Sequence, residues 1–93
     1  MKSFNHLSIS GVVIDLRLNP ERDVILFTLI HNFGGGVQPL FLQCIAPKKI
    51  IDECRPKNGD SVRVEACLKP HQNKITLNVK SITNPNRKNY DSI

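Results

Sequence analysis

The chain has 93 residues, 40% of them hydrophobic, which is typical of a single globular domain and excludes a disordered chain. No apolar run approaches the roughly 20 residues that span a bilayer, and the N-terminus lacks the apolar core and cleavage site of a secretory signal. The net charge of +5 lies in residues 55–93, which carry eight Lys and Arg against three Asp and Glu. Such a basic region favours a polyanionic partner, above all nucleic acid, and a merely solubilising surface is the alternative.

The first predicted strand covers residues 7–18 and changes phase at a glycine. Apolar residues occupy odd positions up to Gly11 and even positions from Val12 onward, so the pattern predicts a β-bulge or a bend at Gly11. A long strand that bends midway can belong to two sheets and close them into a barrel. Residues 19–23, with an Asn-Pro pair at their start, then predict a turn.

The second predicted strand, residues 24–33, has apolar residues on both faces, so its periodicity leaves open which face is core. Residues 34–36 are all glycine and predict either a flexible hairpin tip that closes over a nucleic-acid strand or a simple tight turn. The third strand covers residues 39–46. If Leu40 and Leu42 fill the core, Phe41 is presented outward; burial of Phe41 at a dimer interface is the alternative.

A short helix is predicted over residues 48–55, with Pro47 at its first position and Pro56 as its stop. Period-two alternation then predicts a β-hairpin with strands at residues 63–69 and 74–80, one apolar face, one basic face and a loop over residues 70–73. Periodicity ends near residue 83. We therefore predict one domain over residues 1–83 and a polar tail over residues 84–93.

The predicted order is three strands, a helix and two strands. These are the elements of an all-β, five-stranded OB-fold barrel with one short helix between strands 3 and 4. An SH3-like barrel is the alternative, although it does not normally carry a helix at that place.

Three passages of the chain resemble the bacterial single-stranded DNA-binding protein superfamily. Residues 6–13 are similar to the family's opening strand with its glycine bend, residues 45–54 to its passage from the third strand into the helix, and residues 55–66 to its entry into the fourth strand. The larger members stack bases on tryptophans and end in an acidic tail, whereas this chain has no Trp and ends without such a tail. Its length is closer to primosomal replication protein N, which implies a homodimer of OB domains.

The resemblance and the charge together predict a protein that binds single-stranded DNA without strong sequence preference, in replication, replication restart or recombination. Further predicted partners are a second copy of the chain, in a homodimer or higher homo-oligomer, and a helicase or other replication protein. RNA stays an open alternative to DNA, because OB-fold surfaces accept both. A second hypothesis is a protein-interaction adaptor of a replication complex that contacts DNA little or not at all.

Phosphate contacts are expected from basic residues of the hairpin and of the first turn, and base stacking from exposed aromatic rings. Tyr90 is a further candidate for stacking. The predicted nucleic-acid-binding residues are Arg17, Arg22, Phe33, Phe41, Arg63, Lys69, His71, Lys74 and Lys80.

No catalytic or metal-binding pattern emerges from the sequence. Cys44, Cys54 and Cys67 form no close pair, and the histidines are scattered, so the spacing of a zinc site is missing. An odd number of widely spaced cysteines favours reduced thiols in the cytoplasm over a disulfide framework. We expect a non-enzymatic, cytoplasmic protein without cofactor or metal.

Overall fold

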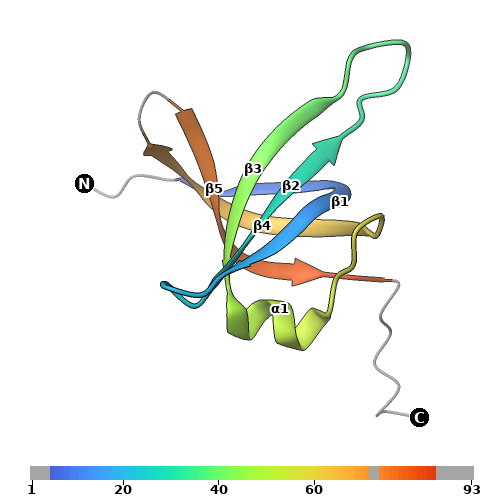
Figure 1. Cartoon of the computed structure of the whole chain (residues 1–93). Helices are drawn as coiled ribbons and strands as arrows, with labels where there is room; N and C mark the ends of the chain where they lie inside the picture. The colour runs from blue at the N-terminus through green and yellow to red at the C-terminus, as the bar shows by residue number, and fades with distance from the viewer. Residues whose placement is uncertain (1–4, 72–73, 86–93) are drawn as a thin grey trace.

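A computed structural model describes residues 5–71 and 74–85, without the side chain of His71 (Figure 1). The strands close into one barrel in the order β1-β2-β3-β5-β4, with β3 and β5 parallel and the other pairs antiparallel. This is the predicted five-stranded OB-fold barrel with a helix between the third and fourth strands. The elements are β1 (Leu7–Asn19), β2 (Val24–His31), β3 (Leu40–Pro47), α1 (Lys48–Cys54), β4 (Ser61–His71) and β5 (Lys74–Thr83).

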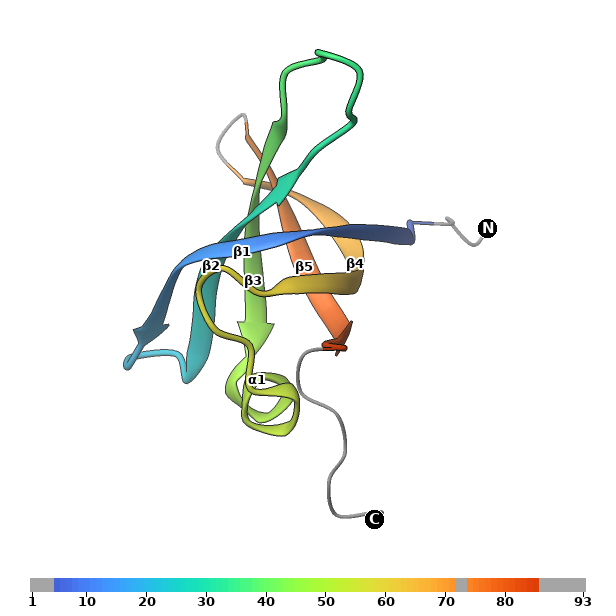
Figure 2. The ribbon, with the colours of Figure 1, turned by 90° about the vertical axis from the view of Figure 1, so that its right-hand side faces the viewer.

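The inner faces of the five strands supply the core. Alternation places every second residue inside, and burying these apolar side chains is the main favourable term in folding. Helix α1 adds Ile51 to the same cluster from one end of the barrel, which it covers in both views of the ribbon (Figures 1 and 2). The largest fully buried side chains are Phe27, Leu29, Leu77, Val13, Val64, Val79 and Cys44.

Strand β1 differs from its prediction in where its phase changes. Val13 is fully buried and Leu16 packs against the core, so the change from odd to even inner positions does occur, but after Val13 and not at Gly11 as predicted. The pairing with β2 shifts between Ile14 and Arg17 instead, around Asp15 with a φ of 57°. The local bend is therefore made by a residue in the left-handed region, which Asp tolerates better than most side chains.

Gly11 is required for a close approach of two strands rather than for a bulge. At this point β1 leaves its partner β4 and begins to pair with β2, since Val12 lies opposite both Ser61 and Ile30. A Cβ atom on Gly11 would lie 2.5 Å from the carbonyl oxygen of Ile30 and 2.8 Å from Leu29 Cγ. The absence of a side chain lets the crossing strands pack directly.

Replacing Gly11 with alanine should therefore destabilise the barrel. The added methyl group meets a backbone carbonyl that cannot rotate away, and overpacking of this kind costs about 1–3 kcal/mol. Urea unfolding of Gly11→Ala should show a lower midpoint with an unchanged slope. Gly59→Ala is a poor control because of its φ of 96°, so Ser10→Ala, an exposed position of the same strand next to Gly11, is the reference. Equal midpoints for Gly11→Ala and Ser10→Ala would contradict the steric argument.

The pairing of β2 with β3 decides which faces are core. Phe27 and Leu29 lie inside opposite Cys44 and Leu42, as the prediction for the third strand requires. Phe41 accordingly points outward, with 58% of its surface exposed. The condition that Leu40 and Leu42 fill the core is met for Leu42, which packs against the core, but not for Leu40, which is 42% exposed.

The helix and the last hairpin follow the prediction with shifted boundaries. Pro47 is the last residue of β3 and caps the helix from outside it, with a φ of −59° and a ψ of 143°, so the predicted first helical position is wrong by one residue. Arg55 ends the helix in the left-handed conformation and donates its N–H to the Ile51 carbonyl. The β4–β5 ladder runs to the pair His71–Lys74, so Pro70 belongs to a strand and the predicted loop was too long.

Asn84, placed by the sequence at the start of the tail, is buried and bonded in the structure. Its amide donates to the Cys54 carbonyl over 3.1 Å and to Asp60 Oδ2 over 3.2 Å. These contacts join the end of β5 to the helix and to the turn before β4. The tail from residue 86 onward lies outside the described residues, and the domain boundary stays a prediction.

Candidate nucleic-acid interface

The outer surfaces of β3, β5 and β4 form one continuous face. Gln43 lies opposite Thr76, and Thr76 lies opposite Lys69, so these three residues form a row across the strands. Two residues along, on the same outer side, come Phe41 of β3 and Lys74 of β5. We call this surface, made by Phe41, Gln43, Lys69, Lys74 and Thr76, the basic face.

The basic face combines a flat ring with two cations and hydrogen-bonding groups. Phe41, Lys69 and Lys74 are exposed, and no ion pair of the described residues involves either lysine. Gln43 is held in place because its amide donates to Thr28 Oγ1 over 3.2 Å. A ring for stacking beside ammonium groups for phosphates is the chemistry of a single-strand binding surface.

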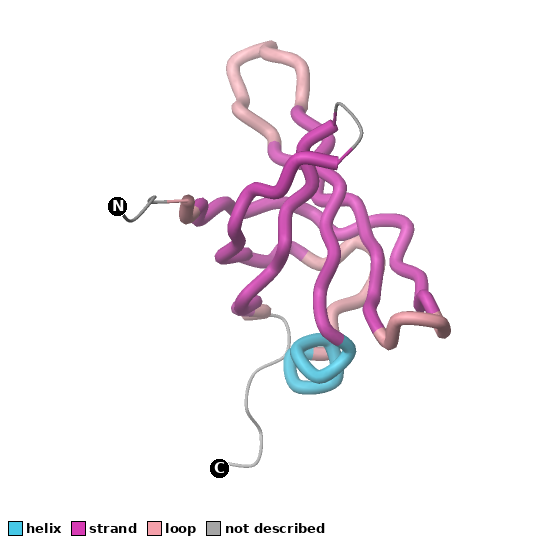
Figure 3. The backbone as a smooth tube through the Cα atoms, turned by 90° about the vertical axis from the view of Figure 1, so that its left-hand side faces the viewer, coloured by secondary structure: helices cyan, strands magenta, loops and turns pink. Residues whose placement is uncertain are grey.

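A loop over residues 32–39 extends this end of the barrel. It projects beyond the strands at the end of the barrel where β4 ends and β5 begins (Figure 3). Gly34, Gly35 and Gly36 have φ values of 76°, 61° and 79°, so side chains would be strained there. Phe33, on this loop, is 57% exposed and contacts His31 edge to face, with ring centroids 4.7 Å apart.

Arg17 and Arg22, by contrast, lie away from the basic face. The turn between β1 and β2 contacts helix α1, because the Lys48 N–H donates to the Asp23 carbonyl. Arg17 forms an ion pair with Asp15. This turn also carries acidic residues, so it does not extend the positive surface of Lys69 and Lys74.

The remaining predicted residues are dispersed. Arg63 is exposed on β4, and Lys80 is exposed on β5 beside the helix residues Glu53 and Cys54. His71 pairs with Lys74 through the backbone, but its side chain, like all of Tyr90, lies outside the described part of the chain. The structure thus places Phe41, Lys69 and Lys74 on one outer face and leaves Arg17, Arg22, Arg63 and Lys80 at other places.

Sequence patterns missed the contributions of Thr76 and His31. Thr76 reaches the basic face only through the parallel β3–β5 pairing, which no local pattern predicts. His31 has the phase of a core residue, yet its ring lies at the end of β2 and its Nδ1 is 2.7 Å from the Ser10 carbonyl oxygen. Both positions follow from strand pairing over long sequence separations.

The three cysteines of the barrel are free thiols. Burial raises the pKa of the Cys44 thiol to about 12 and that of Cys54 to about 11. A thiol with such a pKa stays protonated at neutral pH and is a weak nucleophile and metal ligand. Within the described residues, no three potential metal-binding side chains lie together, and no helix is long and apolar enough to cross a membrane.

The buried Cys44 predicts a loss of stability at alkaline pH. Its pKa rises from 9.0 to about 12 on folding, so the unfolded chain loses the proton first, and stability falls between these values. The slope is at most about 1.4 kcal/mol per pH unit. Chemical unfolding of wild type and Cys44→Ala from pH 8 to 10.5 should give stability curves that converge as pH rises. Curves that stay parallel would contradict the prediction.

Solved structures with the same architecture identify the fold, although no family model and no curated protein sequence matches this chain. The mitochondrial single-stranded DNA-binding protein Rim1 of S. cerevisiae superposes with a TM-score of 0.76 at 16% identity, over 90% of this chain and 96% of Rim1. The chain has the OB-fold of Rim1. A small single-stranded DNA-binding protein from Mycoplasma pneumoniae matches with a TM-score of 0.69 at 15% identity, over 92% of this chain and 99% of that one. The dimeric N-terminal domain of the PriB protein from Thermoanaerobacter tencongensis superposes with a TM-score of 0.69 at 14% identity, over 86% of this chain and 94% of the PriB domain.

Proposed function

We propose that this protein binds single-stranded DNA without strong sequence preference, through the basic face and the neighbouring loop over residues 32–39. The observation that carries the proposal is that the exposed Phe41 and Lys74 each lie two residues beyond the paired row of Gln43 and Thr76, which Lys69 extends on β4. Bases stack on such rings whatever their identity, and ammonium groups bind phosphates without regard to sequence. The single-stranded DNA-binding proteins of the same fold support this choice of ligand.

A salt titration of oligonucleotide binding tests the proposal. Fluorescence anisotropy with a labelled oligo-dT should show binding at low salt that weakens linearly in a plot of log affinity against log salt, with about 0.7 of slope per phosphate contact. Mixed-sequence single strands should bind with similar affinity, and a duplex of the same length more weakly. Lack of binding at low salt, or binding insensitive to salt, would exclude this mode.

A homodimer acting in replication, replication restart or recombination completes the proposal. The chain has few aromatic residues, 5% of its sequence, so affinity per domain is modest and pairing of two domains would raise it. The dimeric PriB domain supports this arrangement, and the free thiols support a cytoplasmic location. Sedimentation with and without oligonucleotide should report a mass near twice 10.5 kDa for the free protein.

A second candidate, a protein-interaction adaptor, is favoured by one feature of the barrel. The outer face of β1 and β2 is aliphatic rather than aromatic, with Val12, Ile14, Leu26 and Ile30 half-buried on it. An aliphatic surface suits a protein partner, such as a helicase or another replication protein, better than it suits stacked bases. Adaptor activity would survive the loss of Lys69 and Lys74, whereas DNA binding would not.

A further inference from the structure

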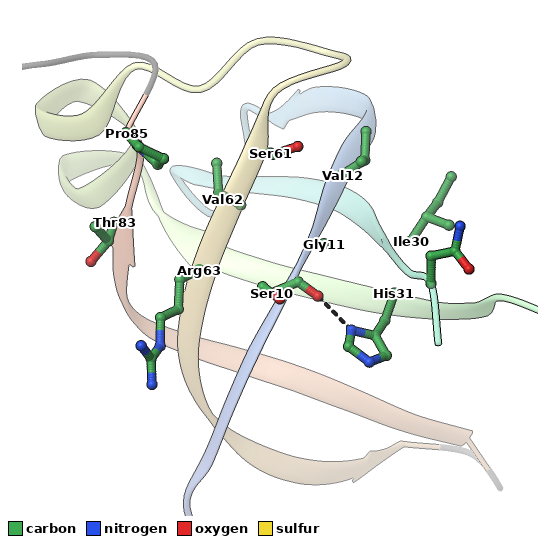
Figure 4. A pocket seen from close by; sticks show the side chains of 11 residues that line it. Ser10, Gly11, Val12, Ile30, His31, Ser61, Val62, Arg63, Thr83 and Pro85 are labelled. Carbon is green, nitrogen blue, oxygen red and sulfur yellow. Dashed lines mark hydrogen bonds between the residues drawn. The ribbon is translucent and has the colours of Figure 1, made fainter. Parts of the chain in front are cut away.

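A trough crosses the outer surface of β2, β1, β4 and β5 at a distance from the basic face. Its volume is about 490 Å³, within the range of small-molecule sites. The residues that line it include one arginine, one histidine, one asparagine and three hydroxyl side chains, and none of them is acidic. Figure 4 shows Arg63 and His31 on opposite sides of Ser10, on either side of strand β1.

The first row of the trough holds a cation between two hydroxyl groups. Arg63 lies opposite Ser10 of β1 and opposite Thr83 of β5. Opposite residues in antiparallel strands are about 5 Å apart, so both hydroxyl groups are neighbours of the arginine. A guanidinium flanked by hydroxyl groups presents several donors to one anion.

The guanidinium of Arg63 keeps donors for such an anion. Its Nε donates to Ser8 Oγ over 3.0 Å, and this hydrogen bond orients the guanidinium group. No ion pair among the described residues involves Arg63, and Glu65, two residues along β4, is instead 3.3 Å from His6. In the part of the chain that the structure describes, the two terminal nitrogens of Arg63 have no acidic partner, so a phosphate would meet a cation that is not already neutralised.

The second row of the trough is apolar. Val12 lies opposite both Ser61 and Ile30, which puts two half-buried aliphatic side chains side by side on the outer surface. Such a surface is suited to the face of a planar ring. The two rows are two residues apart along each strand, about 7 Å.

His31 borders the apolar row with a defined hydrogen-bonding pattern. A carbonyl oxygen can only accept, so the contact of Nδ1 with the Ser10 carbonyl places the proton on Nδ1. In the neutral ring, Nε2 is then an acceptor, and Phe33 packs against the ring edge to face. The amide of Asn32, which also lines the trough, adds an N–H donor, while its Oδ1 accepts from the Gly34 N–H over 3.0 Å.

We propose that the trough binds one nucleotide, with its phosphate at Arg63, Ser10 and Thr83 and its base over Val12 and Ile30 beside His31. The proposal rests on the proposed function and adds a second subsite to it. Arg63 is six residues from Lys69 on β4, about 20 Å along the strand, so one nucleotide cannot occupy both places. The nucleotide is either part of a bound strand or a free mononucleotide, and both share this chemistry.

The test is an NMR titration of the full chain labelled with ¹⁵N, using dTMP, thymidine and inorganic phosphate in separate arms. Dose-dependent amide shifts with dTMP should centre on Ser10, Val12, Asn32 and Thr83 and be weaker with thymidine or phosphate alone. Arg63→Gln should weaken dTMP binding about tenfold, and Arg63→Lys should weaken it less. The control Lys49→Gln removes the same charge from α1 and should leave dTMP binding unchanged. Trough amides that shift neither with dTMP nor with oligo-dT would overturn the trough as a nucleotide site.

A second arm separates this proposal from the proposed function. The same samples are titrated with oligo-dT, and the basic-face amides of Gln43 and Thr76 are followed. Shifts there without any at the trough refute the nucleotide subsite and leave single-strand binding intact. Shifts at the trough with oligo-dT but not with dTMP would refute free mononucleotide binding and assign the subsite to the bound strand. No shift at either place refutes both proposals.

Discussion

Reversing the charge of both lysines on the basic face, in Lys69→Glu/Lys74→Glu, should lower the affinity for oligo-dT by at least about tenfold at low salt. Each phosphate contact contributes about 0.7 to the salt slope for single strands, so the slope should fall by about 1.4. Both side chains are exposed and outside the ion pairs of the described residues, so their loss removes no internal contact. The change should therefore act on binding and not on folding.

The matched control is Lys49→Glu/Lys57→Glu, which makes the same change in net charge on α1 and in the turn after it. Anisotropy titrations of both variants at several salt concentrations separate a local effect from a general one. Unfolding midpoints of both variants should stay close to wild type. Equal losses of affinity in the two variants would show that overall charge, not the basic face, attracts DNA.

The alternation of single strands predicted most of the barrel but not its irregularities. In the middle of β3, β4 and β5 every second residue is apolar and lies inside, so the local pattern suffices there, although Leu40, Leu68 and Ile75 near the strand ends are exposed. In β1 the apolar residues Val12 and Ile14 mimic a core face, although Val13 is the buried residue. The outer side chains of β1 and β2 are also apolar, so hydrophobicity alone does not tell which residues of β1 face the core. The pairing of β1 with its neighbouring strands does.

The candidate site was predictable in its residue types but not in its assembly. Phe41 and Lys74 were identified from exposure and charge, yet their proximity depends on a parallel pairing between β3 and β5. Arg17 and Arg22 carry the right charge but lie beside acidic residues, at the turn whose Asp23 carbonyl accepts from the Lys48 N–H of helix α1. Charge is visible in a sequence, whereas the sign of a surface depends on which charges the fold brings together.

Removing the aromatic ring of the basic face, in Phe41→Ala, should weaken oligo-dT binding by about 1–3 kcal/mol, which is about 5- to 150-fold. Phe41 is 58% exposed and contributes little to the core, so stability should change little. The salt slope should stay that of wild type, because stacking releases no counterions. This combination distinguishes a stacking residue from a phosphate contact.

Leu40→Ala is the matched control for Phe41→Ala, because Leu40 is the preceding residue of β3, has the opposite phase and is 42% exposed. Truncating it removes an exposed apolar side chain from the same strand without touching the basic face, so affinity should stay within about twofold of wild type. Equal losses in both variants would mean that the whole end of β3 is an apolar contact surface. Unchanged oligo-dT binding in Phe41→Ala, together with weaker binding in Lys69→Glu/Lys74→Glu, would show that the basic face binds DNA by electrostatic contacts without stacking. A dimer that dissociates in Phe41→Ala would instead place the ring at an interface between two chains.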